Sequence, residues 1–273
     1  MINFAIHALK RYPWFRRLNA KITYSILAKY IPSEDWHYMN YGYIPNADEC
    51  TKQPLKGCSQ TNPMQMYYYL VHNAGLNGKD VLEVGSGRGG GARHITENFN
   101  PATYTGMDIA DSAVKLATKN HPLKNLKFIQ GSAEAIPLAD NSMDIIINVE
   151  SCHAYGSVDN FLKEVKRVLK PGGRFLMVDF RNEENVENMT TLKQQLSNTG
   201  MEMVRQEDIT GNVIRSIEAE DDAKKKRIQE LVPRRWQNLF SEFAGVVDSK
   251  FYQTLKNGKR LYYRFELRKQ PVG

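Results

Sequence analysis

The sequence contains few cysteines and no long apolar run. Its 273 residues include three cysteines, Cys50, Cys58 and Cys152, whose spacing matches no paired-ligand metal motif. A low and odd count is typical of a protein in a reducing compartment, so no disulfide framework and no metal site are predicted. No apolar run reaches the length of about 18 residues that a membrane-spanning helix needs. The first residues also lack the uninterrupted apolar core of a signal peptide. We therefore expect a cytoplasmic protein.

Acidic residues are absent from the first 33 positions, although the whole chain has 30 Asp and Glu against 37 Lys and Arg, a net charge of +7. Aromatic and aliphatic residues such as Trp14 and Ile22 lie between the basic ones. Such a segment suits either an anionic membrane surface or an ordinary amphipathic helix, so peripheral membrane contact stays open. The basic residues of this segment are Lys10, Arg11, Arg16, Arg17, Lys21 and Lys29.

A second basic run, residues 224–227, follows a group of acidic residues. Glu220 and Lys224, Asp221 and Lys225, and Asp222 and Lys226 are each four residues apart, in the order that favours ion pairs on a helix. The run therefore predicts a solvated helix face, and no nucleic-acid partner is expected.

A glycine-rich turn follows the first β-prone run. Residues 81–91 read Val-Leu-Glu-Val-Gly-Ser-Gly-Arg-Gly-Gly-Gly, and a helical pattern begins at Ala92. A strand, a turn without side chains and a helix N-terminus let a ligand lie against bare backbone. Both a dinucleotide and S-adenosylmethionine (SAM) are compatible with such a turn. Glu83 within the strand would repel a pyrophosphate but suits the ammonium group of a methionine.

Further β-prone runs cover 103–109, 126–130, 143–148 and 174–179, and helical patterns alternate with them. This alternation predicts a parallel sheet with right-handed crossovers. The second run ends at Asp108, where a carboxylate is expected to meet ribose hydroxyls. The turn Lys170-Pro-Gly-Gly173 precedes the fifth run. These features favour SAM over a nicotinamide cofactor, which stays a distant alternative.

The chain resembles class I SAM-dependent methyltransferases. The resemblance is closest to the small-molecule and lipid O-methyltransferases that include the phthiotriol/phenolphthiotriol dimycocerosates methyltransferases. It implies a Rossmann-like α/β fold with a seven-stranded sheet, SAM as cofactor and S-adenosyl-L-homocysteine as product. One departure is Ser132, which stands where a carboxylate would meet the adenine amine. The matching segments are Leu82-Glu-Val-Gly-Ser-Gly87, Gly89-Gly-Gly-Ala92, 101–108, Gly131-Ser-Ala-Glu134, Asn148-Val-Glu-Ser-Cys-His-Ala-Tyr155 and Val168-Leu-Lys-Pro-Gly-Gly173.

Cofactor-binding residues are expected in the turn, at the ends of the next strands and in the aromatic segment 36–43, which the resemblance places over the cofactor. For Tyr41 in that segment an aromatic core cluster is the alternative, and for Glu134 an acid at a helix start. The expected residues are Glu83, Gly85, Ser86, Gly87, Asp108, Ile109, Ser132, Ala133, Glu134, Asn148 and Tyr41.

Methyl transfer from a sulfonium needs alignment above all, but a hydroxyl acceptor also benefits from a base. His153 follows the fourth strand, at the sheet end where the cofactor is expected, and the resemblance points to the same position. Asp179, which ends the fifth strand, is expected to orient it. The alternatives are a histidine tucked under a loop and a capping carboxylate. His37 is the rival base.

The chain divides into an N-terminal helical cap (1–75), a SAM-binding core (76–181) and a C-terminal hairpin with a helical lid (182–273), within one structural domain. The patterns predict helices over 160–169 and 185–199, a strand over 201–210, two helices over 212–243 broken at Pro233, and a last strand over 261–267. The cap and the helical insertion are the expected substrate lid.

The sequence thus predicts an O-methyltransferase that acts on a hydroxyl of a small-molecule or lipid-like acceptor, with His153 as general base. Fatty-acid carboxyls, sugar hydroxyls and carbon acceptors are alternatives, and a carboxylate would need no base. A SAM-binding sensor without catalysis and a membrane-surface protein are the alternatives from other functional classes.

Overall fold

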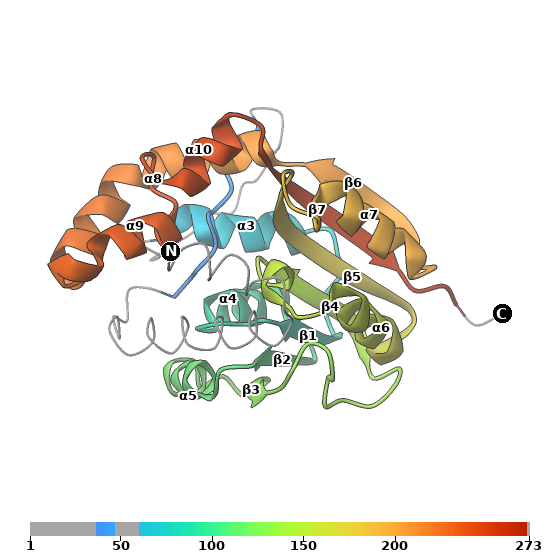
Figure 1. The fold of residues 1–273 in the computed structure, drawn as a ribbon. Coiled ribbons are helices and arrows are strands. Elements are labelled where there is room, and N and C mark those ends of the chain that lie inside the picture. The colour runs from blue at the N-terminus through green and yellow to red at the C-terminus, as the bar shows by residue number, and fades with distance from the viewer. Residues whose placement is uncertain (1–36, 47–59, 272–273) are drawn as a thin grey trace.

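The fold is built on a seven-stranded sheet with the strand order β3-β2-β1-β4-β5-β7-β6 (Figure 1). The computed structural model describes residues 37–46 and 60–271. The strands β1 to β5 run parallel to one another, and β7 is antiparallel to both β5 and β6. The strands are β1 (Asp80–Val84), β2 (Thr103–Asp108), β3 (Leu126–Gln130), β4 (Met143–Val149), β5 (Leu169–Asn182), β6 (Glu202–Asp208) and β7 (Arg260–Arg268).

Helices cover both faces of the sheet, and α8, α9 and α10 pack together as a separate layer, drawn in orange and red in Figure 1. We refer to these three helices as the lid. The described helices are α3 (Thr61–Val71), α4 (Gly90–Phe99), α5 (Asp111–Asn120), α6 (Val158–Val168), α7 (Met189–Asn198), α8 (Thr210–Leu231), α9 (Gln237–Ala244) and α10 (Lys250–Lys256), with the 3-10 turns η1 (Cys152–Ala154) and η2 (Arg234–Trp236).

The nearly continuous apolar run of β4 reflects burial on both faces. Ile145 and Ile147 belong to a buried cluster with side chains of α3 and α4. Ile146, on the opposite face, belongs to a second cluster with α6 and α7. Because side chains alternate along a strand, one sequence run supplies both clusters.

The predicted strands are all confirmed, but the sequence did not indicate the irregular pairing of β5 with β4 or of β6 with β7. β5 begins at Leu169, five residues before the predicted run, and passes through the expected turn. Met143 pairs with Leu169 while Ile145 pairs with Arg174, so the residues between Leu169 and Arg174 form a bulge against β4.

The helix α6 confirms the predicted amphipathic segment but starts two residues earlier. The Ser157 side chain accepts a hydrogen bond from Asn160 N, which caps the helix and sets its start. Similarly, α7 begins only at Met189, because Asn188 caps it through Thr191 N.

The C-terminal insertion is confirmed: α8 ends at Leu231, just before Pro233, and the lid lies between β6 and β7. Helix α10 was not predicted, because its seven residues are too few for a clear periodic pattern. Residues 131–142 contain no helix, so the alternative role of Glu134 as an acid at a helix start is wrong. Within the predicted N-terminal helical region, α3 is a helix, but residues 37–46 contain neither helix nor strand. The basic segment 1–33 lies outside the described residues.

We expect Phe161→Ala to lower the free energy of unfolding by about 3–5 kcal/mol, because it removes a buried aromatic ring. Phe161 is fully buried between Tyr155 and Phe175, with ring centroids 4.9 and 5.8 Å away. Urea unfolding measures the change. Lys163→Ala, at an exposed position of the same helix, is the control and should stay within about 0.5 kcal/mol of the wild type. Equal effects of the two substitutions would contradict this packing.

Candidate active site

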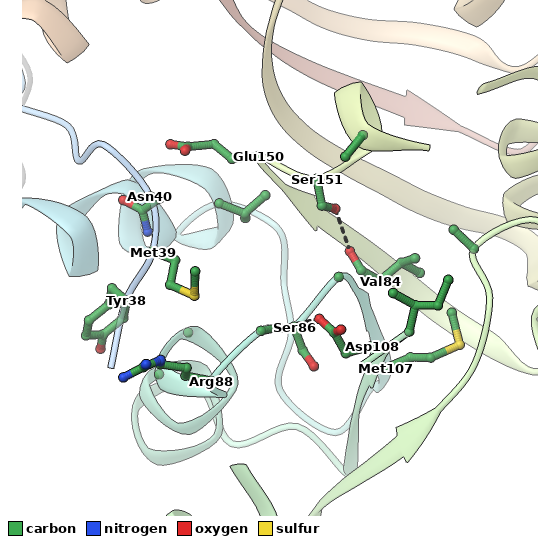
Figure 2. Close-up of a pocket in the computed structure, with 18 of the residues that line it drawn as sticks. Tyr38, Met39, Asn40, Val84, Ser86, Arg88, Met107, Asp108, Glu150 and Ser151 are labelled. Atoms are coloured by element: carbon green, nitrogen blue, oxygen red, sulfur yellow. Dashed lines mark hydrogen bonds between the residues drawn. The ribbon is translucent and has the colours of Figure 1, made fainter. Parts of the chain in front are cut away.

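A cavity opens at the carboxyl ends of β1, β2 and β4. The sheet order reverses between β1 and β4, and in open parallel sheets a crevice forms at such a point. Figure 2 shows Tyr38, Met39 and Asn40 on one wall, facing Ser86 and Asp108 on the other. The cavity therefore lies between the glycine-rich turn and the segment 37–46.

The glycine-rich turn contains more glycines than a tight turn needs. At several of these positions a side chain would overlap atoms of neighbouring residues. Gly85 has φ +81°, and a Cβ there would lie 2.3 Å from Ser151 Oγ. A Cβ on Gly91 would lie 2.1 Å from the ring of Tyr67 in α3. The turn thus joins the cavity floor to α3 and to the end of β4.

Asp108 and Ser86 present polar groups to the cavity. Asp108 Oδ2 accepts a hydrogen bond from Gly87 N, and Oδ1 accepts one from Ala110 N, both at 2.9 Å. Burial raises the pKa of Asp108, although these backbone donors oppose the shift. The buried Ser86 Oγ has no hydrogen-bond partner within the described ranges. A ligand with hydroxyl groups would satisfy both side chains.

Most of the predicted cofactor residues do line this cavity, including the loop after β3. In that loop Ser132 Oγ accepts a hydrogen bond from Glu134 N at 3.3 Å, and Glu134 Oε1 accepts one from Gly156 N at 3.0 Å. The predicted residues that line the cavity are Gly85, Ser86, Gly87, Asp108, Ile109, Ser132, Ala133 and Glu134.

Glu83 is not brought to the cavity. Its carboxylate is fully buried beneath the turn, where Oε1 accepts a hydrogen bond from Tyr67 Oη at 2.7 Å and Oε2 accepts one from Tyr104 Oη at 3.0 Å. Burial raises the pKa of Glu83 to about 7. The expected contact with a methionine ammonium group is therefore replaced by two tyrosine hydroxyls.

Asn148 and Tyr41 lie behind the cavity wall rather than in it. Asn148 Nδ2 donates to Val84 O at 2.9 Å and to Ser151 Oγ at 2.8 Å. The Tyr41 ring stacks on Phe251 with centroids 4.0 Å apart, which is the aromatic cluster considered as its alternative role. Asn148 therefore supports Val84 and Ser151, which line the cavity.

Glu150 lines the cavity and was missed as a site residue. It lies directly after β4 in left-handed backbone geometry, with φ +47°, which is uncommon outside glycine. Its Oε1 accepts a hydrogen bond from Tyr41 N at 2.8 Å, and burial raises its pKa to about 8. The available signal was a carboxylate at the end of an apolar strand, three residues before His153. His37, the rival base, also lines the cavity.

His153 and Asp179 meet as predicted. His153 Nδ1 lies 2.8 Å from Asp179 Oδ1, and His153 N donates to Oδ2 at 2.9 Å. Burial alone would raise the pKa of Asp179, but His153 and Arg181 outweigh burial and hold it well below its usual range. An ionised carboxylate can only accept a hydrogen bond, so Nδ1 is the donor and Nε2 is the ring nitrogen left to accept a proton.

His153 itself does not line the cavity. Its neighbours Ser151 and Ala154 do, while its own ring packs on Phe180. The His153 side chain is 29% exposed. Within residues 37–46 and 60–271, no cluster of three or more potential metal ligands occurs, and no helix is long and apolar enough to cross a membrane.

The raised pKa of Glu150 predicts a pH-dependent stability. Between the usual glutamate pKa and about 8 the folded state binds more protons at this site than the unfolded state, so the free energy of unfolding falls as pH rises. We expect Glu150→Gln to reduce this fall between about pH 5 and 8, measured by urea unfolding at several pH values. Exposed Glu97→Gln should leave the slope unchanged. A wild-type slope in the Glu150 variant would refute this ionisation.

Similarity to known proteins agrees with this geometry. Residues 76–242 match the family described as methyltransferase domain. The chain is 34% identical to a fatty-acid O-methyltransferase of Mycolicibacterium smegmatis over 95% of each chain. It is 31% identical to a phthiotriol/phenolphthiotriol dimycocerosates methyltransferase of Mycobacterium tuberculosis, over 88% of this chain and 87% of the relative.

Solved structures share the fold at low identity. The [4+2]-cyclase SpnF superposes with a TM-score of 0.70 at 20% identity, covering 93% of this chain and 96% of its own. A putative sarcosine dimethylglycine methyltransferase from Galdieria sulphuraria gives 0.72 at 17% identity, covering 86% and 96%. With the sheet order and the cavity, these similarities show that the chain belongs to the methyltransferase domain family and is a Rossmann-like class I methyltransferase whose cofactor is SAM.

Proposed function

We propose that this enzyme methylates a hydroxyl group of a lipid-like acceptor, with His153 as general base. The observation that carries the proposal is the hydrogen bond between His153 Nδ1 and the buried Asp179, next in the chain to the cavity-lining residue Ala154. A base that is held by a carboxylate and leaves one ring nitrogen available suits removal of a hydroxyl proton.

In this proposal the cofactor lies along the glycine-rich turn. Asp108 and the unpaired Ser86 hydroxyl bind its polar groups, and Gly85 and Gly87 let it approach the backbone. Met107 of β2 lines this part of the cavity and offers the adenine an apolar surface. When bound, SAM supplies an electrophilic methyl group on a sulfonium.

The lipid-like acceptor is inferred from the relatives, which are named for fatty acids and for phthiotriol and phenolphthiotriol dimycocerosates. The structure supports a partly apolar acceptor because a second cavity, lined in part by Ile228, Phe243 and Ala244 of the lid, lies beside the first. Both cavities share the wall formed by residues 38–40.

His153 and Asp179 have different roles in the proposed proton transfer. His153 Nε2 accepts the proton that leaves the acceptor hydroxyl. Asp179 keeps Nδ1 protonated and stabilises the imidazolium that forms, and Arg181, with Nη1 3.3 Å from Asp179 Oδ2, keeps this carboxylate charged. A carboxylate acceptor would not need this proton transfer, and this difference separates the two acceptor types.

We expect His153→Ala to lower kcat for a hydroxyl acceptor by about two to four orders of magnitude, which is the usual contribution of a general base. Asp179→Asn should lower it less, since the base itself remains. SAM affinity, measured by calorimetry, should be unchanged in both variants. His72→Gln, which lies outside the cavity lining, is the control. Unchanged turnover of His153→Ala would exclude the base role and favour a carboxylate acceptor.

We expect Asp108→Ala to weaken SAM binding by about 10- to 100-fold, the range for losing a hydrogen bond to a charged group. Calorimetry with SAM gives Kd directly. Asp111→Ala, half exposed at the start of α5, is the matched control. Thermal unfolding checks that loss of the Gly87 and Ala110 contacts has not unfolded the turn. An unaltered Kd would rule out the proposed role of Asp108.

A further inference from the structure

The second cavity lies under the lid and contains positive charge that the proposed chemistry does not use. It adjoins the cofactor cavity through the shared residues Tyr38, Met39 and Asn40. Helices α8 and α9 form its opposite wall. From α8, the side chains of Lys224, Arg227 and Ile228 line it.

Lys224 is the most unusual of these residues. Its Nζ is buried and has no hydrogen-bond partner in the described part of the chain. The nearest carboxylate oxygen, Glu220 Oε2, is 3.7 Å away, beyond hydrogen-bond distance. The expectation of a fully solvated helix face is therefore wrong for Lys224, whereas its neighbour Lys225 does pair with Asp221, at 2.7 Å.

Arg227 adds a second cation, three residues further along α8. It is half-buried and makes no hydrogen bond or salt bridge with the residues that the structure describes. Glu220 and Glu150 are the acidic groups that interact with Lys224. Burial favours the neutral form of both carboxyls and also lowers the pKa of Lys224, so an anion beside Lys224 would favour its charged form.

The rest of the cavity wall is largely apolar. Pro63, Ile228, Phe243 and Ala244 surround the two cationic groups. Among the described residues, the buried Lys224 ammonium has only the Glu220 carboxylate at 3.7 Å and the ring of Tyr41, whose centroid is 6.0 Å away. An anion placed beside it would add the close hydrogen bond that the lid does not provide. An apolar molecule that carries one negative charge is complementary to this surface.

We propose that Lys224 and Arg227 bind an anionic group, a carboxylate or a phosphate, of the lipid-like acceptor and so select charged acceptors over neutral ones. This inference rests on the proposed function, because the cavity can select an acceptor only if one enters beside the cofactor. The experiment below distinguishes a carboxylate from a phosphate as the anionic group.

The test compares three acceptors of equal chain length that share one terminal hydroxyl: an ω-hydroxy fatty acid, its methyl ester, and the corresponding hydroxyalkyl phosphate. Wild-type enzyme should show a lower KM for one or both anionic compounds than for the ester. Lys224→Gln should raise the KM for the preferred anion by about 10- to 100-fold. The KM for the ester and the Kd for SAM should not change.

Two further variants complete the test. Lys226→Gln, on the solvent side of the same helix with a 76% exposed side chain, is the matched control and should behave as wild type. Arg227→Gln should give a smaller rise in KM, because Arg227 is half-buried, and it keeps the test decisive if Lys224→Gln does not fold. Lys224→Arg should restore most of the preference for the anion.

Equal KM values for ester and anions, or equal effects of Lys224→Gln and Lys226→Gln, would overturn the inference and leave the methyltransferase proposal intact. If wild-type enzyme methylates none of the three, calorimetry of the hydroxy fatty acid and the hydroxyalkyl phosphate with protein saturated in S-adenosyl-L-homocysteine decides separately. Binding that Lys224→Gln weakens would support the anion site although the proposed reaction had failed, and no binding of either anion to wild type would reject the site.

Discussion

The parallel pairing of β1 with β2 on one side and with β4 on the other is the constraint on which the candidate site depends. It aligns three strand ends at one edge of the sheet, so Gly85, Asp108 and Glu150 reach the same cavity from separate parts of the sequence. The chain leaves β1 toward β2 and returns to β4 on the opposite side, and this reversal opens the crevice. Because every polar group there emerges from a strand end, the sheet fixes their relative positions before any loop contributes.

Site residues whose role follows from their position along a strand could be predicted from the sequence. Asp108 and Asp179 could be placed because each ends a β-prone run, and the ends of parallel strands meet at one edge. The contact of His153 with Asp179 follows from the pairing of β4 with β5, in which Val149 lies beside Val178. In a parallel sheet, residues at the ends of adjacent strands become spatial neighbours. The fold, the position of Asp108 and the contact of His153 with Asp179 could therefore be predicted.

The position of a side chain could not be predicted where its hydrogen-bond or stacking partner is distant in the sequence. Glu83 lies on the sheet face covered by α3, so Tyr67 from that helix and Tyr104 from β2 take its oxygens. Its position in the motif gave no indication of these partners. Tyr41 was likewise expected at the cofactor, but Phe251 of the lid provides a stacking surface for its ring. No local pattern specifies which face such a side chain occupies when its partners come from another helix.

The burial of Lys224 was also not predicted, although the sequence pattern of α8 indicates it. Val213, Ile217 and Ile228 are buried along one stripe of α8, and the spacing of four residues continues from Ile228 back to Lys224. The acidic residues at i−4 suggested solvation, but ion-pair spacing says only which residues are neighbours on the helix, not which face meets the core. Burial of the stripe sets Lys224 toward the cavity while Lys225, one residue on, pairs with Asp221 and Asp248.

The placement of these charges gives the site a direction. His153 and the ionised Asp179 lie at the β5 end, and Lys224 lies under the lid. Glu150 lies between them and interacts electrostatically with both Asp179 and Lys224. Its raised pKa leaves Glu150 largely neutral near pH 7, so it separates the anionic from the cationic part of the site without neutralising either. An amphiphilic acceptor with its negative group near Lys224 and its hydroxyl near His153 would match both ends, whereas the reverse orientation would place its negative group beside the carboxylate of Asp179.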